Sequence, residues 1–112
     1  MELGLDDFSG EILRNKGILV VVFVASWCGF CKRFYPIFQA AAEKNGIAWA
    51  QVDISDYENP LWEAFRIGVV PTIIIFKEGK AVFRKDGVLG RGLSQKAIDE
   101  SMEQMKLLSR PS

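Results

Sequence analysis

Runs of apolar residues along the chain predict strands separated by helical segments. Residues 18–25 are continuously apolar and largely β-branched, which is typical of a strand buried on both faces of a sheet. In residues 47–53, small apolar side chains at positions 48, 50 and 52 alternate with larger or polar ones at positions 47, 49, 51 and 53, which predicts a second strand. Residues 72–76 form a third dense apolar run, and a turn at residues 78–80 leads into residues 81–83 as the other arm of a hairpin.

Apolar spacing and capping residues predict four helices around these strands. Apolar side chains recur every three or four positions over about 28–45, and Gly46 follows as a helix-ending residue. A short helix is expected over residues 7–15, another is opened by Pro60, and the last begins after the N-cap residue Ser94. Helices that alternate with the first three strands favour a parallel crossover followed by an antiparallel hairpin.

This order of elements predicts an α/β fold, with a central mixed sheet of about four strands flanked by helices on both faces. The chain has 112 residues, a length that suits a single domain over residues 1–112. Apolar residues make up 49% of the chain and charged residues 25%, which is the composition of an ordered globular protein rather than a disordered one.

Charge and hydropathy give no reason to expect a nucleic-acid or membrane partner. The 14 basic residues balance the 14 acidic ones, so no net charge would attract nucleic acid or an anionic membrane. The longest apolar run, residues 18–25, is far too short to span a bilayer. The acidic start, residues 1–7, lacks the pattern of a signal peptide. We therefore expect a cytoplasmic protein, and we expect it to act as a monomer.

The cysteine and histidine content excludes several kinds of site. The chain has no histidine and two cysteines, Cys28 and Cys31. A Cys–His or Ser–His couple is therefore excluded, and so is a four-ligand zinc site within one chain. A c-type haem site is excluded as well, because Lys32 takes the place of the histidine that such a site requires. We expect no metal and no other cofactor.

Several uses of the two thiols remain open. A structural disulfide is a poor explanation, because a bridge across two intervening residues closes a very short loop. Two chains could share a metal cluster to which each gives two thiolates, and the thiols could also be inert core residues. The remaining use is thiol–disulfide exchange, and the place of the pair in the chain favours it.

The pair falls where the buried strand gives way to a helix. The free N–H groups and the positive end of the helix dipole at a helix start stabilise a thiolate. Two intervening residues let Cys31 reach Cys28 within one helical turn. We therefore predict that Cys28 is the attacking thiol, and that Cys31, one turn deeper and more buried, resolves the mixed disulfide.

From about Asp7 to Met105 the chain resembles thioredoxins. The resemblance is carried by Ala25-x-Trp27-Cys28-Gly29-x-Cys31-Lys32, Pro36, Asp53, Val69-Val70-Pro71-Thr72, Phe76-Lys77-x-Gly79-Lys80 and Asp86-Gly87. It implies the thioredoxin fold and reversible thiol–disulfide exchange, with a cis bond before Pro71 packed against the two sulfurs.

The resemblance also implies an apolar collar around Cys28 that binds extended protein segments by strand addition. Its expected members are Trp27, Gly29, Phe30, Val70 and Pro71. The implied partners are disulfide-bearing proteins as substrates and a flavin-dependent reductase of the thioredoxin-reductase type as electron donor. The leading prediction is therefore a protein-disulfide reductase that contributes to electron transport and cell redox homeostasis.

Three positions depart from the pattern of the family. Val22 stands where most thioredoxins carry a buried Asp that takes the proton of the resolving cysteine, and Gln51 stands where they usually carry a Lys that pairs with it. Phe30 replaces the usual Pro between the cysteines. We expect a redox potential between those of reducing thioredoxins and oxidising isomerases. A disulfide oxidase or isomerase, or a slow or inert adaptor of the same fold, remains the alternative.

Overall fold

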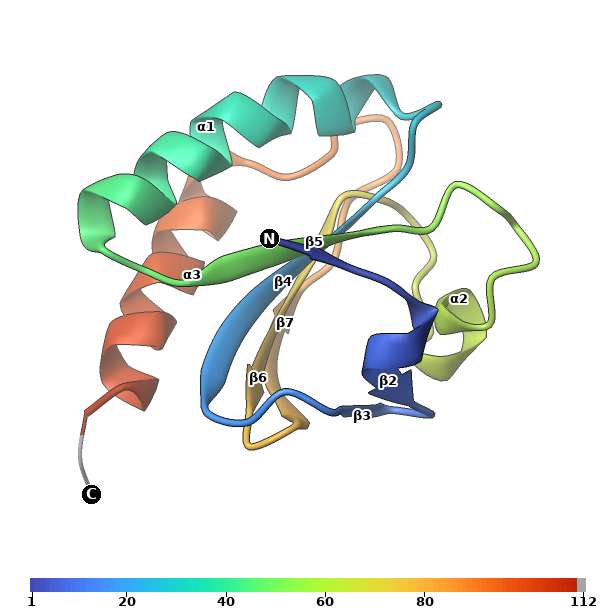
Figure 1. Ribbon diagram of the computed structural model, residues 1–112. Helices are drawn as coiled ribbons and strands as arrows, with labels where there is room; N and C mark the ends of the chain where they lie inside the picture. The colour runs from blue at the N-terminus through green and yellow to red at the C-terminus, as the bar shows by residue number, and fades with distance from the viewer. Residues whose placement is uncertain (111–112) are drawn as a thin grey trace.

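A mixed five-stranded sheet forms the centre of the computed structural model, which describes residues 1–110 (Figure 1). The end of the expected domain, residues 111–112, lies outside the described residues. The strands, in their spatial order, are β1 (Glu2–Leu3), β5 (Trp49–Asp53), β4 (Ile18–Val24), β6 (Thr72–Lys77) and β7 (Lys80–Lys85). Strand β4 pairs in parallel with β5 and antiparallel with β6. The predicted mixed sheet is confirmed, with five strands in place of about four.

The central strand β4 is apolar throughout because both of its faces are covered. Val21 and Phe23 point into one core cluster, and Val20 and Val22 into another. All four side chains are at most 2% exposed. The strand predicted over 18–25 is therefore confirmed, together with the reason for its continuous apolar sequence.

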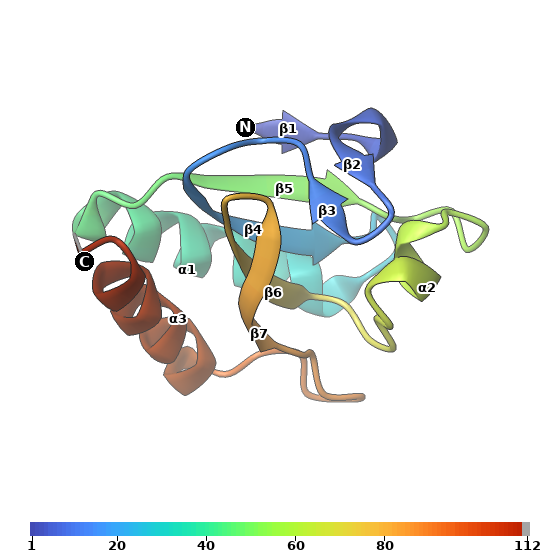
Figure 2. The ribbon, with the colours of Figure 1, turned by 90° about the horizontal axis from the view of Figure 1, so that it is seen from below.

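Two long helices cover one face of the sheet, α1 (Gly29–Asn45) and α3 (Gln95–Leu108), as Figure 2 shows. The other face is covered by the N-terminal segment and by the short helix α2 (Leu61–Ala64). The predicted ends of these helices are confirmed. Helix α1 ends at Gly46, whose φ is 62°, and the Ser94 side chain caps α3 by accepting a hydrogen bond from the Ala97 N–H at 3.1 Å.

The helix expected over residues 7–15 is wrong. This segment follows a single 3₁₀ turn, η1 (Leu5–Asp7), and forms a small antiparallel pair, β2 (Phe8–Ser9) with β3 (Ile12–Leu13). Gly10 adopts a φ of 59° in the turn between them, and a glycine in the interior of a helix costs about 1 kcal/mol relative to alanine. The pairing places Phe8 and Leu13 in the same core, so burial decides against local helical spacing.

Strand β1 is the element that the sequence pattern did not reveal. It has two residues and joins the edge of β5 in parallel, with Leu3 opposite Val52. The Gln51 N–H also donates to the Met1 carbonyl at 2.9 Å. A pair of residues has no hydrophobic period, so only the free edge of β5 gives this strand its place.

The remaining elements lie where they were expected. Strand β6 leads into β7 through a turn in which Glu78 and Gly79 have φ values of 51° and 84°, the backbone of a tight hairpin. Pro60 precedes the first residue of α2. The carboxyl ends of β4 and β5 lead into the segments that carry the cysteines and the loop at residues 54–60, and both lie at the same edge of the sheet (Figure 1).

Candidate active site

Cys28 is the N-cap residue of α1 and joins the buried strand to the helix. Its backbone is extended, with φ −94° and ψ 109°, and its sulfur accepts a hydrogen bond from the Cys31 N–H at 3.1 Å. The predicted helix start at the cysteine pair is confirmed. A sulfur in this position accepts a hydrogen bond from one of the free N–H groups of the first helical turn.

The segment around Val70 lies against the same sulfur. The Cys28 thiol donates to the Val70 carbonyl at 3.4 Å, and the peptide bond between Val70 and Pro71 is cis. Val70 and Pro71 are both buried. Both cysteines are free thiols. The structure thus brings residues 42 positions apart into direct contact at the end of the sheet.

We expected Cys31 to be more buried than Cys28, but the two thiols are buried to nearly the same extent. Cys28 is 6% exposed and Cys31 is 5% exposed, so the resolving thiol is not clearly the deeper one. Its surroundings differ all the same. Burial raises the pKa of Cys31 to about 12, helped by its hydrogen bond with Cys28 and by the negative charges of Cys28 and Asp53, while a backbone hydrogen bond at Ala25 acts in the opposite direction. Cys31 is therefore a protonated thiol at neutral pH.

A groove beside the Cys28 sulfur is lined by most residues of the predicted collar. It has a volume of about 390 Å³, and we name it the Cys28 groove. It is lined by Trp27, Cys28, Gly29, Phe30, Tyr57, Trp62, Gly68, Val69, Val70, Leu89 and Gly90. Four of the five residues predicted to bind substrate are among these, and the fifth, Pro71, is buried outside the lining.

Trp27 forms one wall of the Cys28 groove and is 49% exposed. Its ring stacks on Tyr57, with 5.1 Å between ring centres, and on Trp62 at 6.2 Å. The indole N–H donates to the Ser55 carbonyl at 2.9 Å. Trp27 is thus held by the loop after β5 with much of its surface open to solvent.

Sequence reasoning missed three large side chains of this groove, those of Tyr57, Trp62 and Leu89. Tyr57 is 74% exposed and Leu89 is 85% exposed. Tyr57 lies in an acidic loop that follows β5, and Leu89 lies in a stretch without any hydrophobic period. Only the fold brings both loops beside Cys28.

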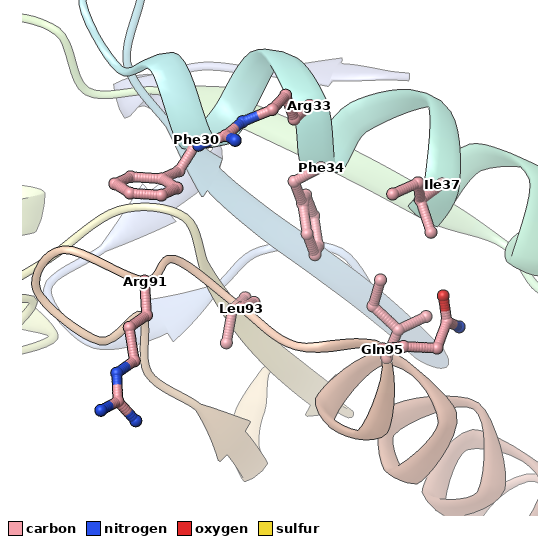
Figure 3. A pocket seen from close by; sticks show the side chains of 8 residues that line it. Phe30, Arg33, Phe34, Ile37, Arg91, Leu93 and Gln95 are labelled. Carbon is pink, nitrogen blue, oxygen red and sulfur yellow. The ribbon is translucent and has the colours of Figure 1, made fainter.

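Phe30 packs on a loop far along the chain. The Arg33 guanidinium lies 4.8 Å from the centre of the Phe30 ring. Gly92 has a φ of +71°, and a Cβ added there would lie 2.9 Å from the Phe30 Cβ. Figure 3 shows Phe30 and Arg33 at one end of a hollow between α1 and the segment that leads into α3. Phe30, which replaces the usual proline, is therefore held in place by Arg33 and by the loop at Gly92.

A second groove, on another side of the site, is lined in part by Cys31. We name it the Cys31 groove; its volume is about 380 Å³. It is lined by Val24, Ala25, Ser26, Cys31, Lys32, Tyr35, Gln51 and Asp53. Asp53 is the one carboxylate in this lining. Sequence reasoning had singled out Asp53 only as part of a family resemblance.

Within residues 1–110, no group of three or more histidine, cysteine or acidic side chains is arranged to hold a metal ion. Nor does that part of the chain contain a helix with the length and apolar character needed to cross a membrane.

Comparison with known proteins decides the family. The family model described as Thioredoxin matches residues 1–103. The chain belongs to the thioredoxin family. It is 35% identical over 101 residues to "Thioredoxin X, chloroplastic" of Arabidopsis thaliana, a match that covers 88% of this chain and 56% of the relative. It is also 35% identical over 96 residues to a thioredoxin of Chlamydia muridarum, covering 85% of this chain and 91% of that protein.

Solved structures agree with the thioredoxin fold. The crystal structure of Chlamydomonas reinhardtii thioredoxin f2 matches with a TM-score of 0.76, covering 99% of this chain and 98% of that one at 20% sequence identity. This likeness concerns the fold alone. The chain spans little more than half the length of the Arabidopsis relative. Because that relative is named chloroplastic, the cytoplasmic location stays a prediction.

Proposed function

We propose that this thioredoxin-family chain reduces disulfide bonds of other proteins by dithiol exchange at Cys28 and Cys31. The observation that carries the proposal is the contrast between the two thiols. The Cys28 sulfur caps α1 and borders an apolar groove, whereas the Cys31 thiol is protonated at neutral pH. Family membership supports thiol–disulfide exchange in general, and the reducing direction is part of the proposal.

The first step uses Cys28. Its thiolate attacks one sulfur of the substrate disulfide, a new bond joins Cys28 to that sulfur, and the other substrate sulfur leaves as a thiolate that takes a proton from solvent. The hydrogen bond from the Cys31 N–H stabilises the attacking thiolate. The product is a mixed disulfide between the chain and its substrate.

The second step uses Cys31. Its sulfur loses a proton and attacks the Cys28 sulfur, so that a bond forms within the pair and the bond to the substrate breaks. The substrate then holds two thiols and the chain holds a disulfide. Two electrons and two protons from an external dithiol donor, of the thioredoxin-reductase type, restore the starting state.

The Cys28 groove supplies the binding surface in this proposal. The Val70 carbonyl accepts a hydrogen bond from the Cys28 thiol in the free protein. Val70 lines the groove together with Trp27 and Phe30. An extended substrate segment pairs with this backbone, and the apolar walls contact its side chains. Such recognition needs little sequence preference, because it relies on backbone hydrogen bonds and apolar area.

Reduction of insulin disulfides in the presence of a dithiol donor tests the proposal. We expect the wild-type chain to accelerate the reaction, Cys28→Ser to abolish the acceleration, and Cys31→Ser to accumulate a mixed disulfide that mass spectrometry detects. Absence of acceleration by the wild-type protein would refute the reductase and leave the oxidase or isomerase and the inert adaptor.

The oxidase or isomerase of the same fold is the second candidate, and Phe30 at the usual proline position favours its consideration. The redox potential of the pair separates the two. A value near about −270 mV fits a reductase, and a value of about −120 to −180 mV fits an oxidase or isomerase. Refolding of scrambled ribonuclease gives an independent answer.

A further inference from the structure

The resolving step needs a proton acceptor, and the usual position of one is apolar here. Val22 is 2% exposed and lies opposite Gln51 in the parallel pair of β4 and β5. The Gln51 amide donates to the Glu2 carboxylate at the sheet edge. Neither Val22 nor Gln51 can take the proton that Cys31 loses. Provided that the proposed function holds, that proton passes to solvent or to another group near Cys31.

Asp53 lies in a position from which it can accept the Cys31 proton. Side chains of β5 alternate, so Trp49, Gln51 and Asp53 share the face that α1 covers, and Trp49 packs on Phe38 of that helix. Helix α1 begins over the carboxyl end of β5, where Asp53 is the last residue of the strand. The two elements enclose the Cys31 groove, whose lining contains both Cys31 and Asp53.

The Asp53 carboxylate is held in a fixed network. One of its oxygens accepts two hydrogen bonds, one from the Ser55 N–H at 2.8 Å and one from the Ser55 hydroxyl. The oxygen of that hydroxyl lies 3.1 Å from the hydroxyl of Ser26, which borders the groove. The hydrogen bonds found for the described residues engage only one of the two carboxylate oxygens.

The groove leaves room for water between the two groups. A water molecule occupies about 30 Å³ in the liquid, and the volume of about 380 Å³ accommodates several. Asp53 and Lys32 are exposed, so solvent enters freely. The titratable groups that face the Cys31 thiol are Cys28, Lys32 and Tyr35 from α1 and its N-cap, and Asp53 from β5. Of these, Asp53 alone carries a carboxylate, whose oxygens are proton acceptors.

We propose that Asp53 accepts the Cys31 proton through water in the Cys31 groove while Cys31 attacks the mixed disulfide. The proton passes from the Cys31 sulfur to water and from water to the carboxylate. The Cys31 electron pair forms the bond to the Cys28 sulfur, and the electrons of the broken bond leave with the substrate sulfur. When a donor reduces the pair again, the Cys31 sulfur takes up a proton through the same groove.

The electrostatics of the site agree with this assignment. The Asp53 charge is among the causes that raise the pKa of Cys31, so the carboxylate and the thiol sense each other. A neighbour that disfavours the thiolate before the attack slows the step unless it also takes the proton. Placing the acceptor in the groove resolves this conflict, because the proton and the charge then move together.

Single-turnover reaction with a dithiobis(nitrobenzoate) tests the proposal. Attack by Cys28 releases a first coloured thiolate, and attack by Cys31 releases a second. Because the first release reports only on Cys28, it serves as an internal control. In Asp53→Asn we expect the second release to slow by about tenfold near neutral pH and to lose part of its pH dependence, with the first release within about twofold of wild type.

Matched variants separate proton transfer from loss of charge or fold. Asp56→Asn removes a carboxylate from the same loop that does not line the groove, and we expect both releases to stay at wild-type rates. Asp53→Glu restores a carboxylate, and we expect it to recover most of the second release. Ser55→Ala removes the hydroxyl hydrogen bond to the carboxylate and keeps the one from the backbone N–H, so we expect a smaller slowing with the wild-type pH profile; this variant also serves if Asp53→Asn fails to fold.

Two outcomes would overturn the role of Asp53. One is a second release in Asp53→Asn with the rate and pH profile of the wild type. The other is an equal slowing in Asp56→Asn. Absence of even the first release in the wild-type protein would instead overturn the proposed function.

Discussion

The backbone N–H of Cys31 donates a hydrogen bond to the sulfur of Cys28 across 3.1 Å. In the proposed function, one residue thus supplies both a donor to the attacking sulfur and the thiol that later displaces the substrate. The two functions do not interfere, because the donor is on the backbone and the thiol is on the side chain. The N-cap position of Cys28 and the first turn of α1 fix this relationship.

Alkylation of the reduced protein should discriminate between the two thiols. Because the pKa of Cys31 is raised to about 12, mainly by burial, we expect iodoacetamide at neutral pH to modify Cys28 and leave Cys31 unmodified. In Cys28→Ser, we expect Cys31 to become reactive only well above pH 9. Peptide mass spectrometry at a series of pH values measures both. Equal labelling of the two sites at pH 7 would contradict the assignment of roles.

Stability of the reduced protein should depend on the charge state of Cys31. The pKa of this thiol is about 12 in the folded chain against an ordinary value of 9.0, so its stabilising effect is complete below pH 9 and is lost as pH rises toward 12. We expect the unfolding free energy of wild type to fall relative to that of Cys31→Ser by up to about 1.4 kcal/mol per pH unit in this range.

Guanidinium unfolding of the two reduced proteins at matched pH values measures that difference. Groups present in both proteins, such as lysines and tyrosines, cancel in the comparison. Parallel stability curves between pH 9 and pH 11 would mean that Cys31 ionises as readily in the folded chain as in the unfolded one.

Removal of the Tyr57 ring should weaken substrate binding. Tyr57 stacks on Trp27 with ring planes 19° apart, and aromatic pairs of this kind contribute about 0.5–1.5 kcal/mol. We expect Tyr57→Ala to lower kcat/KM for insulin reduction by roughly two- to tenfold, mainly through KM. Tyr57→Phe keeps the ring and should retain wild-type values. An unchanged KM in Tyr57→Ala would place substrate binding elsewhere.

Contact with Phe30 should make Gly92 more sensitive to substitution than its neighbour Gly90. Both have left-handed backbones, with φ of +71° and +78°, so alanine costs about 1–2 kcal/mol at either position. A Cβ at position 92 would also lie 2.9 Å from the Phe30 Cβ, whereas one at position 90 has no neighbour within 4 Å. We expect Gly92→Ala to be the more destabilising by about 1 kcal/mol or more.

A double-mutant cycle isolates this contact. Because the close approach also involves the first ring atoms of Phe30, shortening that residue to alanine removes part of the clash. We expect Phe30→Ala combined with Gly92→Ala to show a coupling free energy of about 0.5 kcal/mol or more, measured by denaturant unfolding. Additive effects would show that the loop moves away from α1 without cost.

Local patterns were sufficient to predict most of the fold. The apolar run of β4 and the caps at Gly46 and Ser94 act over a few residues, so the printed sequence reveals them directly. Residues 7–15 misled, because their spacing suits a helix until Phe8 and Leu13 find a common core across a turn. Strand β1 could not be found at all, since two residues carry no period.

The sequence by itself determined the chemistry of this protein. With two cysteines and no histidine, their place at a helix start favoured thiol–disulfide exchange over the other uses of the thiols, and the motif indicated the family. The tertiary structure decided what surrounds that pair. Tyr57 and Leu89 reach the Cys28 groove, and Asp53 reaches the Cys31 groove, because the sheet brings the ends of separate strands to one edge. Contacts between residues far apart in the sequence depend on tertiary packing, and the local hydrophobic pattern does not reveal them.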